Sequence, residues 1–242
     1  MAADHLAVDL AVTVRHDGHD GIADDLAAPE GLTGWVRAHA GVLAADLEPA
    51  GGAAGFTADA AALAAAVEVR TAVRALFARA VLPGPPSAAD AGRLPSAAQA
   101  ADRLNAAAAR VPYAPRLDWP HDAAPTAGRT VAGAPSAADL VAAALARHAI
   151  AFLTGPDRER LRACPAPRCV RYFVKEHARQ EWCKPSCGNR ARVARHHARH
   201  RATAAQRAAA AAPDAGGATG GDGGGGGGAS GAHGGTDLAR EA

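Results

Sequence analysis

Apolar side chains recur at the spacing of an α-helix in the segment 57–80, which has the clearest helical pattern before the first cysteine. They fall on two adjoining stripes, Val69, Val73, Leu76 and Ala80 on one, and Leu63, Val67 and Phe77 on the other. We expect Thr57 to cap this helix and Asp59 to lie in its first turn. The pattern therefore predicts a long core helix with one broad apolar face.

Three other helices are predicted from the residues at their ends. The segment 29–40 has proline at the first helical position and glycine just beyond its end. The sequences SAAQ (96–99) and SAAD (136–139) resemble capping boxes, so a helix should follow each of them. The apolar segment 5–15 is too short to tell a helix from a buried strand.

Extended structure is predicted in two places. The segments VPYAPRLDWP (111–120) and GRTVAG (128–133) are expected to pair as a small hairpin. The run VRYFV (170–174) is β-prone, and RQEW (179–182) is expected to return beside it. The predicted fold class is therefore mainly α with small β elements, an α+β fold.

Composition and charge divide the chain into unlike parts. Hydrophobic residues make up 49% of the sequence, but many are alanine and only 4% are aromatic, so the core must depend on scattered larger side chains. The segment 158–207 holds 14 Lys and Arg against 3 Asp and Glu, whereas the rest of the chain is acidic. Such asymmetry indicates a basic interaction module joined to an acidic body.

We predict three domains from these patterns. Residues 1–156 form a mostly helical domain, 157–202 a cysteine-containing finger with a basic helix, and 203–242 an Ala/Gly-rich tail that is mostly disordered. No apolar run reaches the ~20 residues of a membrane span, and the first residues do not resemble a signal peptide. We therefore expect a cytoplasmic protein with no membrane partner.

The four cysteines have the spacing of a metal site. Cys164 and Cys169 form one close pair, Cys183 and Cys187 form another, and thirteen residues separate the pairs. Two close pairs can wrap a tetrahedral ion, and disulfides seldom persist in the cytosol. We predict one structural Zn²⁺ per chain, with iron as the chief competitor and a thiol switch, a disulfide pair or isolated core cysteines as the alternatives.

The residues around the cysteines predict a zinc-anchored basic helix. Gly188 is expected to allow a tight turn, and a helix-prone segment follows it. A cysteine knuckle, a hairpin and a helix that starts at the last ligand together resemble a treble clef. Tyr172, Phe173 and Trp182 are expected to form the small core of this unit, with base stacking by an exposed Tyr172 as the alternative.

Four arginines of the basic helix are candidate nucleic-acid contacts. They are Arg190, Arg192, Arg195 and Arg199. Their guanidinium groups suit phosphate oxygens, and we expect DNA rather than RNA as the partner. A solvated surface or a partner site for an acidic protein is the alternative interpretation of the same charge run.

Arg70 and Arg74 interrupt the apolar face of the predicted helix 57–80. The simpler explanation is an ion pair with Asp9, Asp46 or another acidic residue, with the aliphatic stems packed against the core. The other is a site for a small anionic effector. The sequence leaves both open.

At these residues the chain resembles two known families. CPAPRC and EWCKPSCGNRARVARH resemble the CGNR zinc finger, which is named for the tetrapeptide at 187–190. LAVDLAVTVR, ADDLAAPEGLTGWV and the arginine-bearing helix resemble the ABATE domain, and the two likenesses together cover about residues 5–202. The resemblance implies stress-related transcription regulation.

Catalysis is not expected. The sequence has no His-Glu-x-x-His, nucleophile elbow or P-loop, and four cysteine ligands leave zinc no open position. We predict a zinc-finger DNA-binding protein, a transcription regulator whose N-terminal domain senses a ligand or forms a homo-oligomer. The alternative is an RNA-binding or protein-interaction zinc module without sequence-specific DNA binding.

Overall fold

The computed structural model describes residues 5–19, 21–90, 92 and 94–211. It divides into two units, residues 1–197 and 198–242. The segment 212–242, which contains most of the predicted disordered tail, lies outside the described residues.

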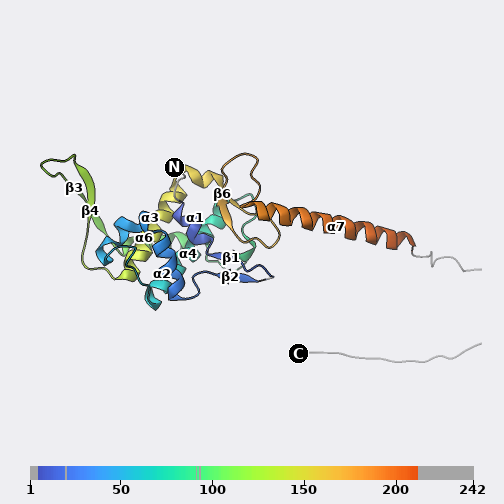
Figure 1. Ribbon diagram of the computed structural model, residues 1–242, viewed down its shortest axis with the longest axis horizontal. Coiled ribbons are helices and arrows are strands. Elements are labelled where there is room, and N and C mark those ends of the chain that lie inside the picture. The colour runs from blue at the N-terminus through green and yellow to red at the C-terminus, as the bar shows by residue number, and fades with distance from the viewer. Residues whose placement is uncertain (1–4, 20, 91, 93, 212–242) are drawn as a thin grey trace, which may run out of the picture. The chain divides into compact units, whose positions relative to one another are not determined.

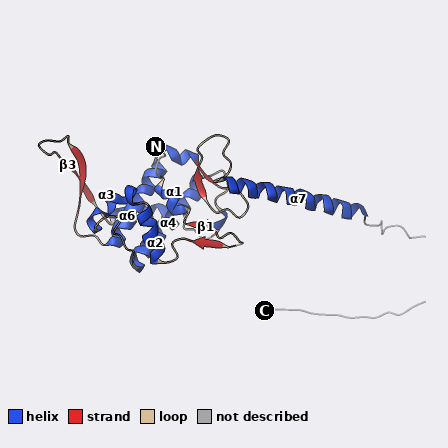
Figure 2. Cartoon of the chain, in the orientation of Figure 1, coloured by secondary structure: helices blue, strands red, loops and turns tan. Residues whose placement is uncertain are grey.

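Helices dominate the first unit, as Figures 1 and 2 show. The six that precede the cysteines are α1 (Leu6–Ala11), α2 (Pro29–Ala38), α3 (Ala40–Leu47), α4 (Ala60–Ala80), α5 (Ala97–Ala109) and α6 (Ala137–Thr154). Short 3₁₀ helices lie at η1 (Glu48–Ala50), η2 (Ala88–Asp90) and η3 (Pro156–Arg160). The last helix, α7, spans Pro185–Ala211.

The described strands form three separate antiparallel hairpins, which confirms the α+β fold class. The strand pairs are β1 (Val14–His16) with β2 (Ile22–Asp24), β3 (Tyr113–Asp118) with β4 (Thr126–Val131), and β5 (Leu161–Ala163) with β6 (Tyr172–Val174). The segment 5–15, which the sequence left undecided, is mostly the helix α1 followed by the start of β1. The predicted hairpin at 111–133 is confirmed as β3 and β4.

The core lies around α4, which packs against α1, α5 and α6. Val69, Val73 and Phe77 of the predicted stripes are buried, and the other stripe residues pack at the edge of the core. The prediction that Thr57 caps this helix is wrong. Asp59 is the N-cap and accepts a hydrogen bond from the Ala62 amide at 2.7 Å, because the helix begins two residues later than expected.

The capping signals at 96–99 and 136–139 are confirmed. Ser96 and Gln99 form a complete capping box at the start of α5, and Ser136 accepts a hydrogen bond from the Asp139 amide at the start of α6. The prediction that Gly41 ends the helix 29–40 is wrong. α2 ends at Ala38 and α3 begins at Ala40, so Gly41 lies inside a second helix instead of ending the first.

Asp46 anchors the β3–β4 hairpin to the helices, which the sequence did not reveal. The buried carboxylate lies 2.9 Å from Arg129 of β4, and it accepts a hydrogen bond from Arg147 of α6 at 2.8 Å. His148, which the sequence places on the apolar side of its helix, lies 3.4 Å from the same carboxylate. Burial alone would raise the pKa of Asp46, but hydrogen bonds from His148 and Arg147 outweigh it and hold the pKa at about 2.

By length and composition α6 alone among the described helices is able to cross a membrane. Half of the helix is buried against neighbouring elements, including α4 and α5. That burial is the ordinary environment of a core helix.

Candidate metal centre

The first cysteine pair lies at the tip of the β5–β6 hairpin. Cys164 follows the last residue of β5, and its amide donates to the Arg171 carbonyl at 2.9 Å. The Cys169 amide donates to the Ala166 carbonyl at 3.0 Å, which closes the turn between the two cysteines. Arg168 adopts a left-handed conformation with φ of 63° in this turn. The knuckle is thus the loop of a two-stranded hairpin.

The predicted pairing of 170–174 with 179–182 is wrong. β6 pairs with β5, in the register Leu161↔Val174 and Ala163↔Tyr172. The segment 179–182 is not a strand. Its first residues end a turn in which the side-chain oxygen of Gln180 accepts a hydrogen bond from the Glu176 amide at 2.7 Å. The sequence pattern did not reveal that the three residues before Cys164 supply the partner strand.

The second cysteine pair lies at the start of α7. Cys187 is fully buried in the first turn of this helix, and its amide donates to the Lys184 carbonyl at 3.0 Å. The prediction of a tight turn at Gly188 is wrong, because the residue lies inside α7. A β-carbon at Gly188 would lie 3.0 Å from Cδ1 of Trp182, so the absence of a side chain lets the indole pack against the helix.

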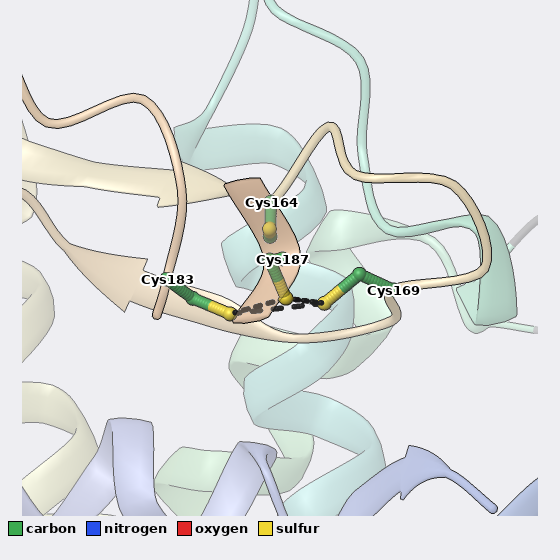
Figure 3. Close-up of side chains that lie close together, drawn as sticks. All are labelled: Cys164, Cys169, Cys183 and Cys187. Atoms are coloured by element: carbon green, nitrogen blue, oxygen red, sulfur yellow. Dashed lines mark hydrogen bonds between the residues drawn. The ribbon is translucent and has the colours of Figure 1, made fainter. Parts of the chain in front are cut away.

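The four sulfur atoms point toward one another (Figure 3) and lie within 4.8 Å of each other. The Sγ of Cys183 is 3.8 Å from that of Cys169 and 3.5 Å from that of Cys187, and Cys169 and Cys187 are also 3.8 Å apart. A tetrahedral ion with bonds of about 2.3 Å to sulfur requires sulfur atoms about 3.8 Å apart. The geometry therefore fits one four-coordinate zinc.

The electrostatics of the sulfur cluster also favour a cation. The pKa of Cys164 is lowered to about 2, first because the Cys169 and Cys183 thiols hydrogen-bond to its sulfur. The same contacts raise the pKa of Cys169 to about 11 and raise that of Cys183 further. One thiolate is thus stabilised at the expense of its neighbours, and a divalent ion is needed to hold all four in the ionised form.

Comparison with family models assigns both parts of the chain. Residues 4–156 match ABATE, described as "Putative stress-induced transcription regulator". The chain belongs to the ABATE family. Residues 160–200 match the CGNR zinc finger, which follows the ABATE domain and contains all four cysteines. A search of curated proteins found no match to the chain.

The cofactor of this ABATE protein is therefore a single structural zinc. Its ligands would be Cys164, Cys169, Cys183 and Cys187. Four thiolates leave no coordination position for water or substrate, so the ion would serve to hold the knuckle, β6 and the start of α7 together. Cys187 lies in the first turn of α7, at the positive end of the helix dipole, which favours the thiolate form of this cysteine.

Arg190 of the CGNR tetrapeptide lies against the sulfur cluster. Its guanidinium donates to the Cys187 sulfur at 3.2 Å, and the side chain is partly buried. Four thiolates on Zn²⁺ carry a net charge of about −2, which a neighbouring guanidinium offsets. The structure thus places Arg190 at the metal centre, although the sequence grouped it with the candidate nucleic-acid contacts.

Replacing Arg190 with glutamine is expected to weaken zinc binding by about 10–100-fold, the usual effect of losing a hydrogen-bond partner of a metal ligand. Competition against a chromogenic chelator at fixed pH measures the change. Arg192→Gln is the matched control, because Arg192 is exposed two residues further along the same helix and contacts Asn189 instead of a sulfur. Equal zinc affinity in the two variants would show that Arg190 does not stabilise the site.

Tyr172 belongs to the main core and not to the small core of the finger. It is 1% exposed, and its ring lies 5.5 Å from that of Phe77. Its hydroxyl donates to Asp90 at 2.6 Å. Base stacking by an exposed Tyr172 is therefore wrong, because the strand β6 turns this side chain toward α4. Phe173, the next residue of β6, packs with the cysteines instead, together with Trp182.

Arg70 and Arg74 both form ion pairs, with partners other than Asp9 and Asp46. Arg70 donates to both oxygens of Asp24 on β2, and Arg74 donates to Asp90 of η2 at 2.8 Å. Asp9 instead lies 3.6 Å from His39. The ion-pair interpretation is confirmed, and the partners are other acidic residues, Asp24 of β2 and Asp90 of η2. The sequence does not show which segments fold over α4.

The remaining predicted contacts lie on the surface of α7. Arg192, Arg195 and Arg199 are exposed, and no carboxylate pairs with them among the described residues. Arg192 donates to the side chain of Asn189, and Arg195 to the Ala191 carbonyl at 3.4 Å. These contacts are local to the helix and leave guanidinium N–H groups for another molecule.

Proposed function

We propose that this ABATE protein is a DNA-binding transcription regulator. In this account the zinc-bound finger fixes the start of α7, and the exposed arginines of α7 bind backbone phosphates. The description of the ABATE family supports a regulatory role. The four free cysteines suit a reducing compartment, so we propose a cytoplasmic location and a binding role instead of catalysis.

The composition of α7 carries the proposal. Between Pro185 and Ala211 the helix has six arginines, three histidines and no acidic residue. Arg192, Arg195 and Arg199 contribute fixed positive charge that internal ion pairs do not neutralise among the described residues. Phosphate contacts of this kind supply most of the affinity of a nucleic-acid-binding protein. Arg190 is assigned instead to the metal centre.

Duplex DNA is the preferred partner on grounds of groove shape. An α-helix with its side chains is about 10–12 Å across, and the major groove of B-DNA is about 12 Å wide. The major groove of an RNA duplex is deep and too narrow for side chains to read its bases. A single exposed basic helix is therefore better suited to DNA.

Binding to random-sequence duplex DNA is expected to fall steeply with salt, and the Arg192→Ala/Arg195→Ala double variant to lose part of that dependence. Each phosphate contact contributes about 0.9 to the slope of log K against log salt, so the slope should decrease by about 1.8. Fluorescence anisotropy across a salt series measures it. Arg103→Ala is the matched control, because Arg103 is exposed on α5, away from the cysteines in the sequence.

Two outcomes would contradict the proposal. An unchanged slope in the double variant would show that these arginines do not contact phosphates. Equal or tighter binding to an RNA duplex, or salt-insensitive binding to an acidic protein without DNA binding, would favour the RNA-binding or protein-interaction module instead.

A further inference from the structure

A cavity of about 800 Å³ lies where the helical domain meets the strand that leads to the zinc ligands. It is lined by the end of α4 and the loop after it, by Leu153 near the end of α6, and by residues of η3 and β5. The volume is within the range of about 300–1,000 Å³ that is usual for small-molecule sites. No residue that holds the metal lines this cavity.

One part of the cavity wall is aliphatic. It consists of Leu76, Val81, Leu82 and Leu153. Leu82 is 63% exposed, and it lies with Leu76, Val81 and Leu153 in one aliphatic wall instead of standing alone on the surface. An apolar chain that covered this wall would remove apolar surface from water, which favours binding.

The other part of the wall is cationic. Among the described residues, Arg79, Arg158 and Arg162 line the cavity with Glu159 as the single acidic residue. Arg162 donates to the carbonyls of Glu159 and Leu161 at 2.8 and 2.7 Å, which orients its side chain. No ion pair involves these arginines among the described residues, in contrast to Arg70 and Arg74 with their aspartates.

We propose that this cavity binds an amphipathic anion, namely a medium-chain aliphatic carboxylate. The carboxylate would accept hydrogen bonds from the arginines, whose planar N–H groups suit its two oxygens. The aliphatic chain would lie along the leucine wall. The anionic site is thus formed by different arginines from those that the sequence singled out, because Arg70 and Arg74 are buried and paired.

The position of the site connects it with the metal centre. Arg162 lies on β5, and Cys164 follows two residues later. A ligand held by Arg162 and by Arg79 of α4 would bridge the ABATE domain and the finger. The support for this ligand site comes from the cavity and its lining residues. The proposal therefore does not require nucleic-acid binding by α7.

Isothermal titration of the zinc-loaded full-length chain with decanoate, below its micelle concentration, tests the proposal. Decanoate should bind one site per chain, and decanol and acetate should each bind about tenfold or more weakly, because one lacks the charge and the other the chain. Arg79→Gln/Arg158→Gln should weaken decanoate binding by a similar factor. Both side chains are exposed, and Arg103→Gln is the matched control.

A second variant keeps the test independent of the arginines. Leu82→Glu places a negative charge beside the aliphatic wall at an exposed position, and it should also weaken decanoate binding about tenfold. The proposal is overturned if decanoate does not bind, if decanol binds as tightly, or if neither the double arginine variant nor Leu82→Glu changes the affinity.

Discussion

Replacing Cys187 with alanine is expected to abolish stoichiometric zinc binding and to unfold the finger. Cys187 is fully buried, and its sulfur lies 3.5 and 3.8 Å from those of Cys183 and Cys169. Structural zinc contributes on the order of 10 kcal/mol of apparent folding free energy at neutral pH. Three remaining thiolates would leave a position open to water and lose most of that stabilisation.

The finger has little else to hold it together. Its own buried cluster consists of Cys164, Ala166, Cys169, Phe173 and Cys187. Three of these five residues are metal ligands whose thiolates would repel one another without a cation. So small a core does not fold without a metal or another cross-link. Unfolding should therefore spread to Phe173 and to the first turn of α7.

Zinc content by elemental analysis and limited proteolysis between residues 164 and 190 measure the loss. Ser186→Ala is the matched control, because Ser186 is exposed one residue earlier in the same helix and is not a ligand. The variant Cys187→Ala should become sensitive to protease while Ser186→Ala stays resistant. A full equivalent of zinc in Cys187→Ala would contradict the assignment of this cysteine.

Replacing Arg74 with alanine is expected to lower the free energy of unfolding by about 3–5 kcal/mol, the usual cost of breaking a buried ion pair by removing one partner. Both members of the Arg74–Asp90 pair are almost fully buried, with side-chain exposures of 4% and 3%. Arg74 also donates to the Ala11 carbonyl at 2.6 Å and to the Val170 carbonyl at 3.3 Å. The substitution would leave a buried carboxylate and two carbonyls without this donor.

The same residue joins the helical domain to the finger. Ala11 ends α1, whereas Val170 follows the first cysteine pair, and the guanidinium of Arg74 lies 5.4 Å from the ring centre of Tyr172. Tyr172 donates its hydroxyl to Asp90. The pKa of Tyr172 is raised mainly because the side chain is buried, and secondly because it lies next to the Asp90 carboxylate. Loss of Arg74 should therefore destabilise both parts of the chain together.

Urea denaturation followed by circular dichroism measures the change in unfolding free energy. Arg70→Ala is the informative comparison, since Arg70 has a similar position on α4 but its partner Asp24 is 38% exposed, so a smaller loss is expected. Arg103→Ala should have almost no effect. A loss for Arg74→Ala no larger than for Arg103→Ala would contradict a stabilising role for the buried pair.

Local signals in the sequence predicted much of the helical domain. Capping residues and apolar spacing placed α4, α5 and α6, because these features act within one or two turns of the chain. Errors arose where end signals were ambiguous. Asp59 caps α4 instead of Thr57, and both residue types are good N-caps two positions apart. Gly41 lies within α3, although a glycine at that position is also typical of a helix end.

Contacts between distant segments were not accessible from the sequence. The partners of Arg70, Arg74 and Asp46 lie on β2, η2, β4 and α6, and the positions of these elements relative to the three residues depend on the tertiary fold. The pairing of β5 with β6 also depends on it, because Leu161 and Tyr172 must both reach the main core. The spacing of the cysteines, in contrast, identified the metal site directly, because chain connectivity limits how four sulfurs can meet around one ion.

The central claim is that four cysteine sulfurs hold one zinc ion at the start of α7. X-ray absorption at the zinc edge of the purified full-length chain, combined with metal analysis, tests it most directly. The expected result is one zinc per chain with four sulfur neighbours at about 2.3 Å. A folded protein without metal, or a zinc shell that includes nitrogen or oxygen in place of a sulfur, would contradict the claim.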